Sequence, residues 1–370
     1  MNLGVDEFRV DAMDEISYDA RQLMISSLSI ENFRCFKKVE LGDLGRFNLV
    51  VGDSGSGKTA LFEAIFLPGN GAGVPVTYRG NRGMIIPSFS PEKDAYDALF
   101  SDLFFELSTD IPIKIKIVGS YQNLRKAEIS FQPITQRPLI PEDELKGDRI
   151  ADRLFTVHTT DADNMQSVQQ VNLKGLLNIG GEHKVASIAF YASSSSGDAR
   201  IFAQMLSDIR KSGADNQIER TMHSLFPQIS DLSPELTGGA AEIYCNVVGV
   251  KRKVPLSLVS NGMSKVLVIL LFIATHPDGV VLVDEIENGI YYKALPKMWG
   301  AIIEFCKSFN VQFFASTHSK ECIEALVPFI EQDDQDFRLI RTEHKNSSHT
   351  ARIFKGKNFS AALETGTEIR

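Results

Sequence analysis

The sequence predicts an α/β fold with a mainly parallel central sheet, an antiparallel β lobe and a helical insertion. Two short apolar runs, at residues 279–283 and 311–315, have the composition of parallel strands that are buried on both faces. Residues 113–118 instead alternate apolar and lysine side chains, which is typical of an antiparallel strand with one wet face. A glycine-rich turn at residues 52–59 joins another apolar strand to a segment with helical spacing.

The remaining elements follow from the same periodicities. Strands are expected at residues 24–30, 46–51, 103–107, 113–118 and 127–131, with a helix at 59–66. Residues 68–92 are rich in Gly, Pro, Asn and Ser, so we expect a loop there. The second half is expected to contain helices at 198–211, 216–226, 263–274 and 295–309, a hairpin of 241–248 with 254–258, and the two buried strands.

Length and composition suggest a globular chain with more than one lobe. Its 370 residues are 43% apolar and 23% charged, which excludes the disordered and fibrous classes. The expected parts are an acidic N-terminal extension at 1–23, an N-terminal lobe at 24–134, a mostly helical and irregular insertion at 135–235, and a C-terminal lobe at 236–370.

Charge and cysteine usage restrict the environment and the partners. Acidic residues outnumber basic ones by 47 to 39, so bulk electrostatics do not favour nucleic acid or an anionic membrane. Cys35, Cys245, Cys306 and Cys322 form no C-x-x-C pair, which is typical of reduced core thiols. The N-terminus is acidic, unlike a signal peptide, and the apolar run at 266–274 is too short to span a membrane. We therefore expect a soluble, cytoplasmic protein.

The glycine-rich turn is a motif with defined chemistry. Its sequence, Gly-Asp-Ser-Gly-Ser-Gly-Lys-Thr, fits the phosphate-loop pattern of a P-loop NTPase, G-x-x-x-x-G-K-[ST], between a strand and a helix. Backbone N–H groups of such a loop surround phosphate oxygens at a helix N-terminus, Lys58 reaches the β- and γ-phosphates, and Thr59 binds Mg²⁺. The alternative is an ordinary glycine turn before a helix. The predicted nucleotide contacts are Gly52, Asp53, Ser54, Gly55, Ser56, Gly57, Lys58, Thr59 and Ala60.

The other groups that a nucleoside triphosphate requires come directly after the two buried strands. Asp284 is expected to hold Mg²⁺, and Glu285 to orient or deprotonate the attacking water. A capping carboxylate pair is the alternative. His318 ends the next strand, where ligands bind in α/β sheets, and is expected either to bond the γ-phosphate or to be structural. The catalytic candidates are therefore Lys58, Glu285 and His318.

A Ser-x-Gly turn at Ser260 and Gly262 opens the most apolar helix. Its simple interpretation is an N-cap, in which the serine hydroxyl satisfies a free N–H. Its functional interpretation is a second phosphate-binding helix end. Two such ends do not serve one nucleotide within a monomer unless the chain folds back, so we expect Ser260 and Gly262 to bind nucleotide held by a second subunit.

The motifs, and the order in which they occur along the chain, resemble those of the ABC-type AAA ATPases of the OLD, RecF and SMC group. The resemblance is greatest to the stand-alone ATPases of bacterial and archaeal anti-phage defence operons. The matching stretches are residues 30–36, 52–59, 260–262, 284–291, 316–319, 321–325 and 368–370. The resemblance implies Mg²⁺-dependent hydrolysis of ATP by a head-to-tail homodimer or higher oligomer with two ATP molecules at its interface. It also implies that Arg34 lies near the nucleotide, that Asn288 lies in a loop reaching the neighbouring subunit, and that His318 is the switch histidine.

The sequence departs from that family at three places. Tyr291 or Tyr292 stands where a histidine is common, and Ser-Asn-Gly replaces Ser-Gly-Gly in the signature turn. The glutamine that relatives carry between the two lobes corresponds to either Gln122 or Gln132. The signature change is expected to slow hydrolysis without abolishing nucleotide binding.

Three functions are compatible with these features. The first is an ATPase that senses a trigger and controls a separate effector, a nuclease, in defence against phage or mobile DNA. The second is a RecF-like DNA-repair ATPase that clamps duplex DNA, for which residues 251–253 are the compact basic run. The third is a nucleotide-dependent scaffold in which turnover is incidental.

Overall fold

The computed structural model describes residues 24–70, 100–119, 124–133, 153–161, 164–172, 175–180, 187–192, 199–332, 335–346 and 348–355. The predicted extension at 1–23, the predicted loop from residue 71 onward, Gln122 and the matching residues 368–370 lie outside this described part. Among the described helices, none combines the length and the apolar character that a bilayer crossing requires.

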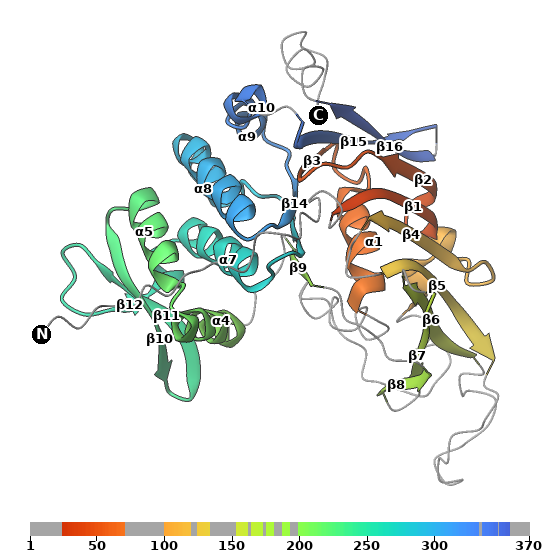
Figure 1. Ribbon diagram of the computed structural model, residues 1–370, viewed down its shortest axis with the longest axis horizontal. Helices are drawn as coiled ribbons and strands as arrows, with labels where there is room; N and C mark the ends of the chain where they lie inside the picture. The colour runs from red at the N-terminus through yellow and green to blue at the C-terminus, as the bar shows by residue number, and fades with distance from the viewer. Residues whose placement is uncertain are drawn as a thin grey trace, which may run out of the picture.

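A six-stranded sheet lies at the centre of the molecule, with strand order β16-β15-β3-β14-β13-β9 (Figure 1). Its strands are β3 (Phe47–Val51), β9 (Ile188–Tyr191), β13 (Val280–Val283), β14 (Gln312–Ser316), β15 (Phe337–Lys345) and β16 (Ser348–Lys355). All neighbours pair in parallel except β15 and β16, which form an antiparallel hairpin. Every residue of β3, β13 and β14 is buried, as their largely apolar sequences predict.

An antiparallel sheet forms the second large layer, with strand order β2-β1-β4-β5-β6-β7-β8. Its strands are β1 (Ile25–Phe33), β2 (Phe36–Gly42), β4 (Ile113–Gly119), β5 (Leu124–Pro133), β6 (Arg153–Asp161), β7 (Gln166–Asn172) and β8 (Gly175–Gly180). The helix α1 (Lys58–Asn70) packs between the two sheets, and its apolar side chains share one core with both. The predicted α/β class with an antiparallel lobe is therefore confirmed.

The prediction of a mostly helical and irregular insertion at 135–235 is wrong for much of its described part. Strands β6, β7 and β8 extend the antiparallel sheet, and β9 joins the central one. The sequence pattern did not predict β6 and β7 because their buried face is partly polar: Thr159, Ser167 and Gln169 are at most 7% exposed. Thr159 and Ser167 hydrogen-bond each other through their hydroxyls at 2.5 Å. Polar residues that pair in this way remove the apolar alternation by which a strand is predicted.

The predicted strand at 103–107 is also wrong, since two short 3-10 helices occupy it, Ser101–Leu103 and Phe105–Leu107. Phe104, which is 1% exposed, packs against the Phe131 ring at 5.7 Å between centroids. Leu107 points outward and is 64% exposed. Its φ of 58° is incompatible with a strand.

Helices cover the other face of the central sheet (Figure 1). They are α4 (Ala199–Ser212), α5 (Asp215–Leu225), α7 (Asn261–Thr275) and α8 (Leu295–Ser308), followed by the short α9 (Lys320–Glu324) and α10 (Val327–Gln332). Ten of the fifteen residues of α7 are buried, so this helix forms the centre of the layer. A small sheet packs beside α4 and α5, formed by β10 (Ile229–Thr237), β11 (Ala240–Val247) and β12 (Val254–Pro255). The predicted hairpin of β11 and β12 is present, but the helix α6 (Leu256–Val259) replaces the end of its second strand.

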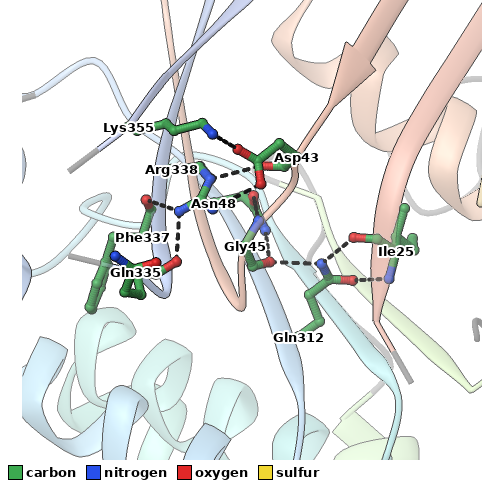
Figure 2. Close-up of polar contacts among 9 residues, drawn as sticks. All are labelled: Ile25, Asp43, Gly45, Asn48, Gln312, Gln335, Phe337, Arg338 and Lys355. Atoms are coloured by element: carbon green, nitrogen blue, oxygen red, sulfur yellow. Dashed lines mark hydrogen bonds and ion pairs between the residues drawn. The ribbon is translucent and has the colours of Figure 1, made fainter. Parts of the chain in front are cut away.

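Buried amides join the two large sheets at the edge where β3 and β14 begin (Figure 2). Gln312, which is 1% exposed, donates to the carbonyls of Ile25 at 2.9 Å and Gly45 at 2.7 Å, and accepts the Ile25 N–H at 2.9 Å. Asn48 bonds both backbone groups of Gly45, at 2.7 and 3.0 Å. This network fixes the start of β1 against the central sheet, so the end of β1 is held over the phosphate loop.

A second group of polar contacts holds the C-terminal hairpin beside the same edge (Figure 2). Arg338 donates to the Asp43 carboxylate at 3.1 Å and to the carbonyls of Gln335 and Phe337. Lys355 forms an ion pair with the same Asp43 carboxylate, whose pKa is lowered chiefly by that ammonium. The β15–β16 hairpin is thus tied to the turn between β2 and β3, and its far end lies against the phosphate loop.

Candidate active site

The phosphate loop runs from β3 to α1, and its glycines are required by the backbone around it. Gly52 and Gly57 have φ values of 143° and 104°, which other residues rarely adopt. A Cβ on Gly52 would lie 2.2 Å from the Thr342 carbonyl oxygen, and one on Gly57 would lie 2.7 Å from the Phe36 ring. The loop is therefore enclosed by β15 on one side and by the start of β2 on the other.

The loop curls around the ammonium group of its own lysine. Lys58 Nζ donates to the carbonyl oxygens of Gly52 at 2.8 Å and Asp53 at 2.9 Å. The side chain is 5% exposed, and this burial lowers the pKa of the ammonium, although the nearby carboxylate of Asp284 acts in the opposite direction. Lys58 is thus held at the mouth of the loop, where a phosphate oxygen is its natural counter-ion.

The two predicted metal ligands lie in direct contact. Thr59 Oγ1, at the start of α1, donates to Asp284 Oδ2 at 2.9 Å, and Ser316 Oγ donates to the other oxygen of this carboxylate. A hydroxyl and a carboxylate at this spacing suit a hard cation such as Mg²⁺, which prefers oxygen ligands. The described residues contain no group of three His, Cys, Asp or Glu side chains that could enclose a metal. The remaining ligands would therefore be phosphate oxygens and water.

Glu285 follows Asp284 and is held by four polar contacts. Its N–H donates to Ser316 Oγ at 2.8 Å, and the Asn288 side-chain amide donates to its carboxylate. Its carbonyl oxygen accepts from the Asn288 backbone N–H at 3.0 Å and from the Lys265 ammonium. Its φ is 48°, in the left-handed region. The carboxylate is oriented by Asn288, as the role of a water-positioning group requires.

Arg34 and His318 border the same space. Arg34 follows β1 and forms ion pairs with Glu63 at 2.9 Å and Asp102 at 3.7 Å. His318 is exposed just beyond the end of β14, and its backbone N–H donates to Glu287 Oε1 at 2.9 Å. Both side chains keep polar hydrogens available for a phosphate or a ribose.

A single pocket of about 470 Å³ collects most of the predicted residues. From the predicted set it is lined by Arg34, Ser54, Gly55, Gly57, Lys58, Thr59, Ala60, Asp284, Glu285 and His318. Gly52, Asp53 and Ser56 are not in its lining. Ser56 is 1% exposed and bonds Thr342 Oγ1 at 2.7 Å, so its hydroxyl supports the loop from inside the protein.

The pocket has walls that sequence reasoning missed. Cys35, Asp102, Phe104, Glu106 and Leu107 complete its lining. His349 on β16 also contacts the loop, with its Nε2 3.2 Å from the Gly55 carbonyl. Cys35 belongs to the matching stretch at 30–36, but no motif marks the other four residues of the lining, which the 3-10 turns bring to the site. The apolar residues at 337, 339 and 340 are a signal that could have indicated β15, the first strand of the hairpin that carries His349.

Ser260 and Gly262 lie outside this pocket. Ser260 is the N-cap of α7, with its hydroxyl 3.4 Å from the Met263 N–H that it accepts. Gly262 is buried, and a Cβ at this position would lie 2.1 Å from the Gly289 carbonyl oxygen. The N-cap interpretation is therefore confirmed, and contact of this turn with a nucleotide of a second subunit stays a prediction.

Two further sequence features have a defined place. Gln132 lies in β5 and donates to Ser130 Oγ at 2.8 Å, outside the lining of the pocket beside the phosphate loop. Tyr291 and Tyr292 are both exposed, with ring centroids 4.8 Å apart. The tyrosines follow the turn at Gly289 and so lie near the start of α7.

Comparison with known proteins agrees with this architecture. The chain is similar to a Helicobacter pylori protein named "ATP/GTP phosphatase", with 23% identity over 92% of this chain and 98% of the relative. A stretch of 49 residues, 13% of this chain, is 45% identical to the DNA replication and repair protein RecF of Idiomarina loihiensis and covers 14% of it.

Solved structures with the same fold include an Smc head bound to the C-winged helix domain of ScpA, with a TM-score of 0.50 and 15% identity over 91% of this chain and 99% of that one. A Pyrococcus furiosus Smc head with an extended coiled coil, bound to the C-terminal domain of ScpA, gives a TM-score of 0.50 and 13% identity, covering 93% and 99% of the two chains. Residues 47–324, more than half of the chain, match the family described as "AAA domain, putative AbiEii toxin, Type IV TA system". The chain belongs to this family of AAA domains.

Proposed function

We propose that this protein binds Mg²⁺-ATP in the pocket of the phosphate loop and hydrolyses it to ADP and phosphate. The observation that carries the proposal is the 2.9 Å contact between Thr59 and Asp284, beside the loop that encloses Lys58. The name of the Helicobacter pylori relative supports phosphatase chemistry on a nucleoside triphosphate. Mg²⁺ held by these two oxygens would neutralise charge on the phosphates.

Each residue of the pocket then has a distinct task. Lys58 exchanges its bonds to the loop carbonyls for phosphate oxygens, and loop N–H groups bind the β-phosphate. Glu285 accepts a hydrogen bond from the attacking water and orients it toward the γ-phosphorus. His318 donates to the γ-phosphate, and Arg34 binds near the nucleotide.

The second half of the proposal is a head-to-tail dimer. In one chain the Ser260 turn lies outside the pocket of Lys58, so one copy leaves a helix N-terminus free for the nucleotide of another. Such a dimer places two ATP molecules between the subunits and makes assembly depend on ATP. The family resemblance at residues 260–262 supports this arrangement.

We further propose that ATP turnover controls a separate effector, a nuclease, in defence against phage or mobile DNA. The described residues contain no group of acidic or histidine side chains suited to the metals of a nuclease, so cleavage would come from a partner. Identification of proteins that co-purify from the native host with and without ATP tests this part, and DNA cleavage by the purified chain alone contradicts it.

Two variants test the ATPase proposal. Lys58→Ala is expected to abolish ATP binding or turnover, because it removes the cation at the mouth of the loop. Glu285→Gln is expected to bind ATP, release little phosphate and accumulate as a dimer, measured by light scattering after size exclusion. Normal hydrolysis by Glu285→Gln would mean that another group activates the water.

A RecF-like DNA clamp is the alternative function, favoured by the matching stretch of 49 residues. The positive charge of its basic run, residues 251–253, is partly neutralised by acidic neighbours. Lys253 Nζ lies 2.9 Å from the Asp231 carboxylate and 3.8 Å from that of Glu235. A clamp should bind duplex DNA only with ATP and should lose affinity steeply as salt rises. Absence of ATP-dependent binding at low salt would exclude it.

A further inference from the structure

Glu285 adopts a backbone conformation that its surroundings must maintain. A φ of 48° is unfavourable for a non-glycine residue, so it persists only where contacts fix it. Ser316 holds the amide and Asn288 holds the carboxylate. The carbonyl accepts from the Asn288 N–H at 3.0 Å and from the Lys265 ammonium, and Lys265 belongs to a different layer of the protein.

Lys265 reaches this carbonyl from the second turn of α7. Its side chain is 5% exposed, with the ammonium 5.5 Å from the centre of the Tyr191 ring. Burial lowers the pKa of this ammonium to about 8, although the carboxylates of Glu287, Glu285 and Asp284 act in the opposite direction. A role in packing alone is better served by an apolar side chain of similar size, because burying a charge costs free energy.

A second contact joins α7 to the segment that follows Glu285. A Cβ on Gly262 would lie 2.1 Å from the Gly289 carbonyl oxygen, so the two backbones touch directly. Gly289 has a φ of 80° and forms the turn after Asn288. A shift of the first turn of α7 therefore displaces the Gly289 backbone through its contact with Gly262. The same shift displaces the Glu285 carbonyl through the hydrogen bond from Lys265.

We infer that Lys265 is a positioning residue, which fixes the backbone of Glu285 and couples the start of α7 to water activation in the same subunit. The inference rests on the proposed function, in which Glu285 orients the attacking water and the Ser260 turn faces the nucleotide of a second copy. Nucleotide bound at that turn biases the position of α7, and Lys265 transmits this bias to Glu285. Hydrolysis is then fast only after assembly.

Two substitutions at Lys265 isolate the hydrogen bond. Lys265→Met keeps an unbranched side chain of similar size and removes the donor. Lys265→Arg keeps donors, and a pocket of about 540 Å³ beside Lys265 leaves room for the longer group. Lys297→Met removes an exposed lysine from α8 and serves as the matched control.

Steady-state ATP hydrolysis and the affinity for a fluorescent ATP analogue are measured for all four proteins. Lys265→Met is expected to lower kcat about 100-fold, as a misplacement of about 1 Å does, with KM and analogue affinity within twofold of wild type. The kcat of Lys265→Arg should be at least tenfold higher than that of Lys265→Met. Lys297→Met should match the wild type throughout.

The outcomes separate this inference from the proposed function. A kcat of Lys265→Met within threefold of wild type overturns the inference, as does a parallel loss of analogue affinity, which indicates damage to the binding pocket. If Lys265→Met does not fold, Lys265→Gln replaces it: a loss confined to kcat supports the inference and wild-type kinetics overturn it. Wild-type protein that neither binds nor hydrolyses ATP overturns the proposed function itself.

Discussion

Removing the ammonium of Lys265 should stabilise the fold at neutral pH, although the same change is expected to slow ATP hydrolysis. The pKa of this ammonium falls from its ordinary 10.5 to about 8 on folding, and burial is the main cause. Each tenfold change in proton affinity corresponds to 1.36 kcal/mol, so protonated Lys265 lowers the free energy of unfolding by about 3 kcal/mol. Loss of its hydrogen bond offsets about 1 kcal/mol, so Lys265→Met should gain about 2 kcal/mol at pH 7.

The sign of the pH dependence follows from the same two values. Between pH 8 and pH 10.5 the unfolded chain still holds a proton at Lys265 that the folded chain has released, so the stability contributed by this group rises with pH. The advantage of Lys265→Met over the wild type should therefore shrink by about 2 kcal/mol between pH 7 and pH 9.5.

Urea denaturation of both proteins at pH 7.0 and pH 9.5, followed by circular dichroism, measures these differences. The comparison between the two proteins removes the contribution of every other titrating group. A Lys265→Met variant that is less stable than the wild type at pH 7, or a difference that does not change with pH, would refute the burial of a charged lysine at this position.

Three further predictions concern the pocket itself. Gly57→Ala should abolish binding of a fluorescent ATP analogue, because its φ is 104° and a Cβ would lie 2.7 Å from the Phe36 ring; wild-type affinity would contradict the loop geometry. Ser316→Ala removes the hydroxyl that bonds Asp284 and the following amide, so phosphate release should fall about 10- to 100-fold and require more Mg²⁺; unchanged Mg²⁺ dependence would argue against the metal site. Burial raises the pKa of the Cys35 thiol to about 11, so alkylation, measured by mass spectrometry, should be slow at pH 7.5, quicken toward pH 11 and be blocked by ATP. An alkylation rate that ATP does not alter would place the nucleotide elsewhere.

The parallel strands and the phosphate loop could be predicted because their signals are local. A strand buried on both faces must be apolar throughout, as in β13, and a phosphate loop needs its glycines at fixed spacing. The carboxylate after β13 followed from the position of that strand. The sequence predicted that this carboxylate and Thr59 bind the same Mg²⁺. Their distance of 2.9 Å depends on how α1 packs between the two sheets, which the sequence pattern does not show.

The features that escaped prediction depend on contacts between distant segments. Ser56 belongs to the phosphate-loop motif, yet its hydroxyl bonds Thr342, which is 286 residues away. Asp102 and Glu106 reach the pocket because Phe104 anchors two short turns in the core. No periodicity marks such residues, since the constraint on each one is its partner rather than its neighbours in sequence.

The phosphate loop and the Ser260 turn, the two parts of the proposed catalytic unit, are supported by different layers of the protein. In the proposed function this arrangement separates the binding of ATP from its hydrolysis. The phosphate loop is enclosed by β15 and by the start of β2, so its glycines are fixed by the two sheets. The Ser260 turn instead begins α7, a helix of the other layer whose contacts with Glu285 and Gly289 carry its position to the catalytic carboxylate. A change in α7 therefore alters the orientation of water while the phosphates remain held. Because the signature turn, its glycine contact and Lys265 all lie within the first two turns of this helix, we expect assembly of the proposed dimer to change the rate of hydrolysis more strongly than the affinity for ATP.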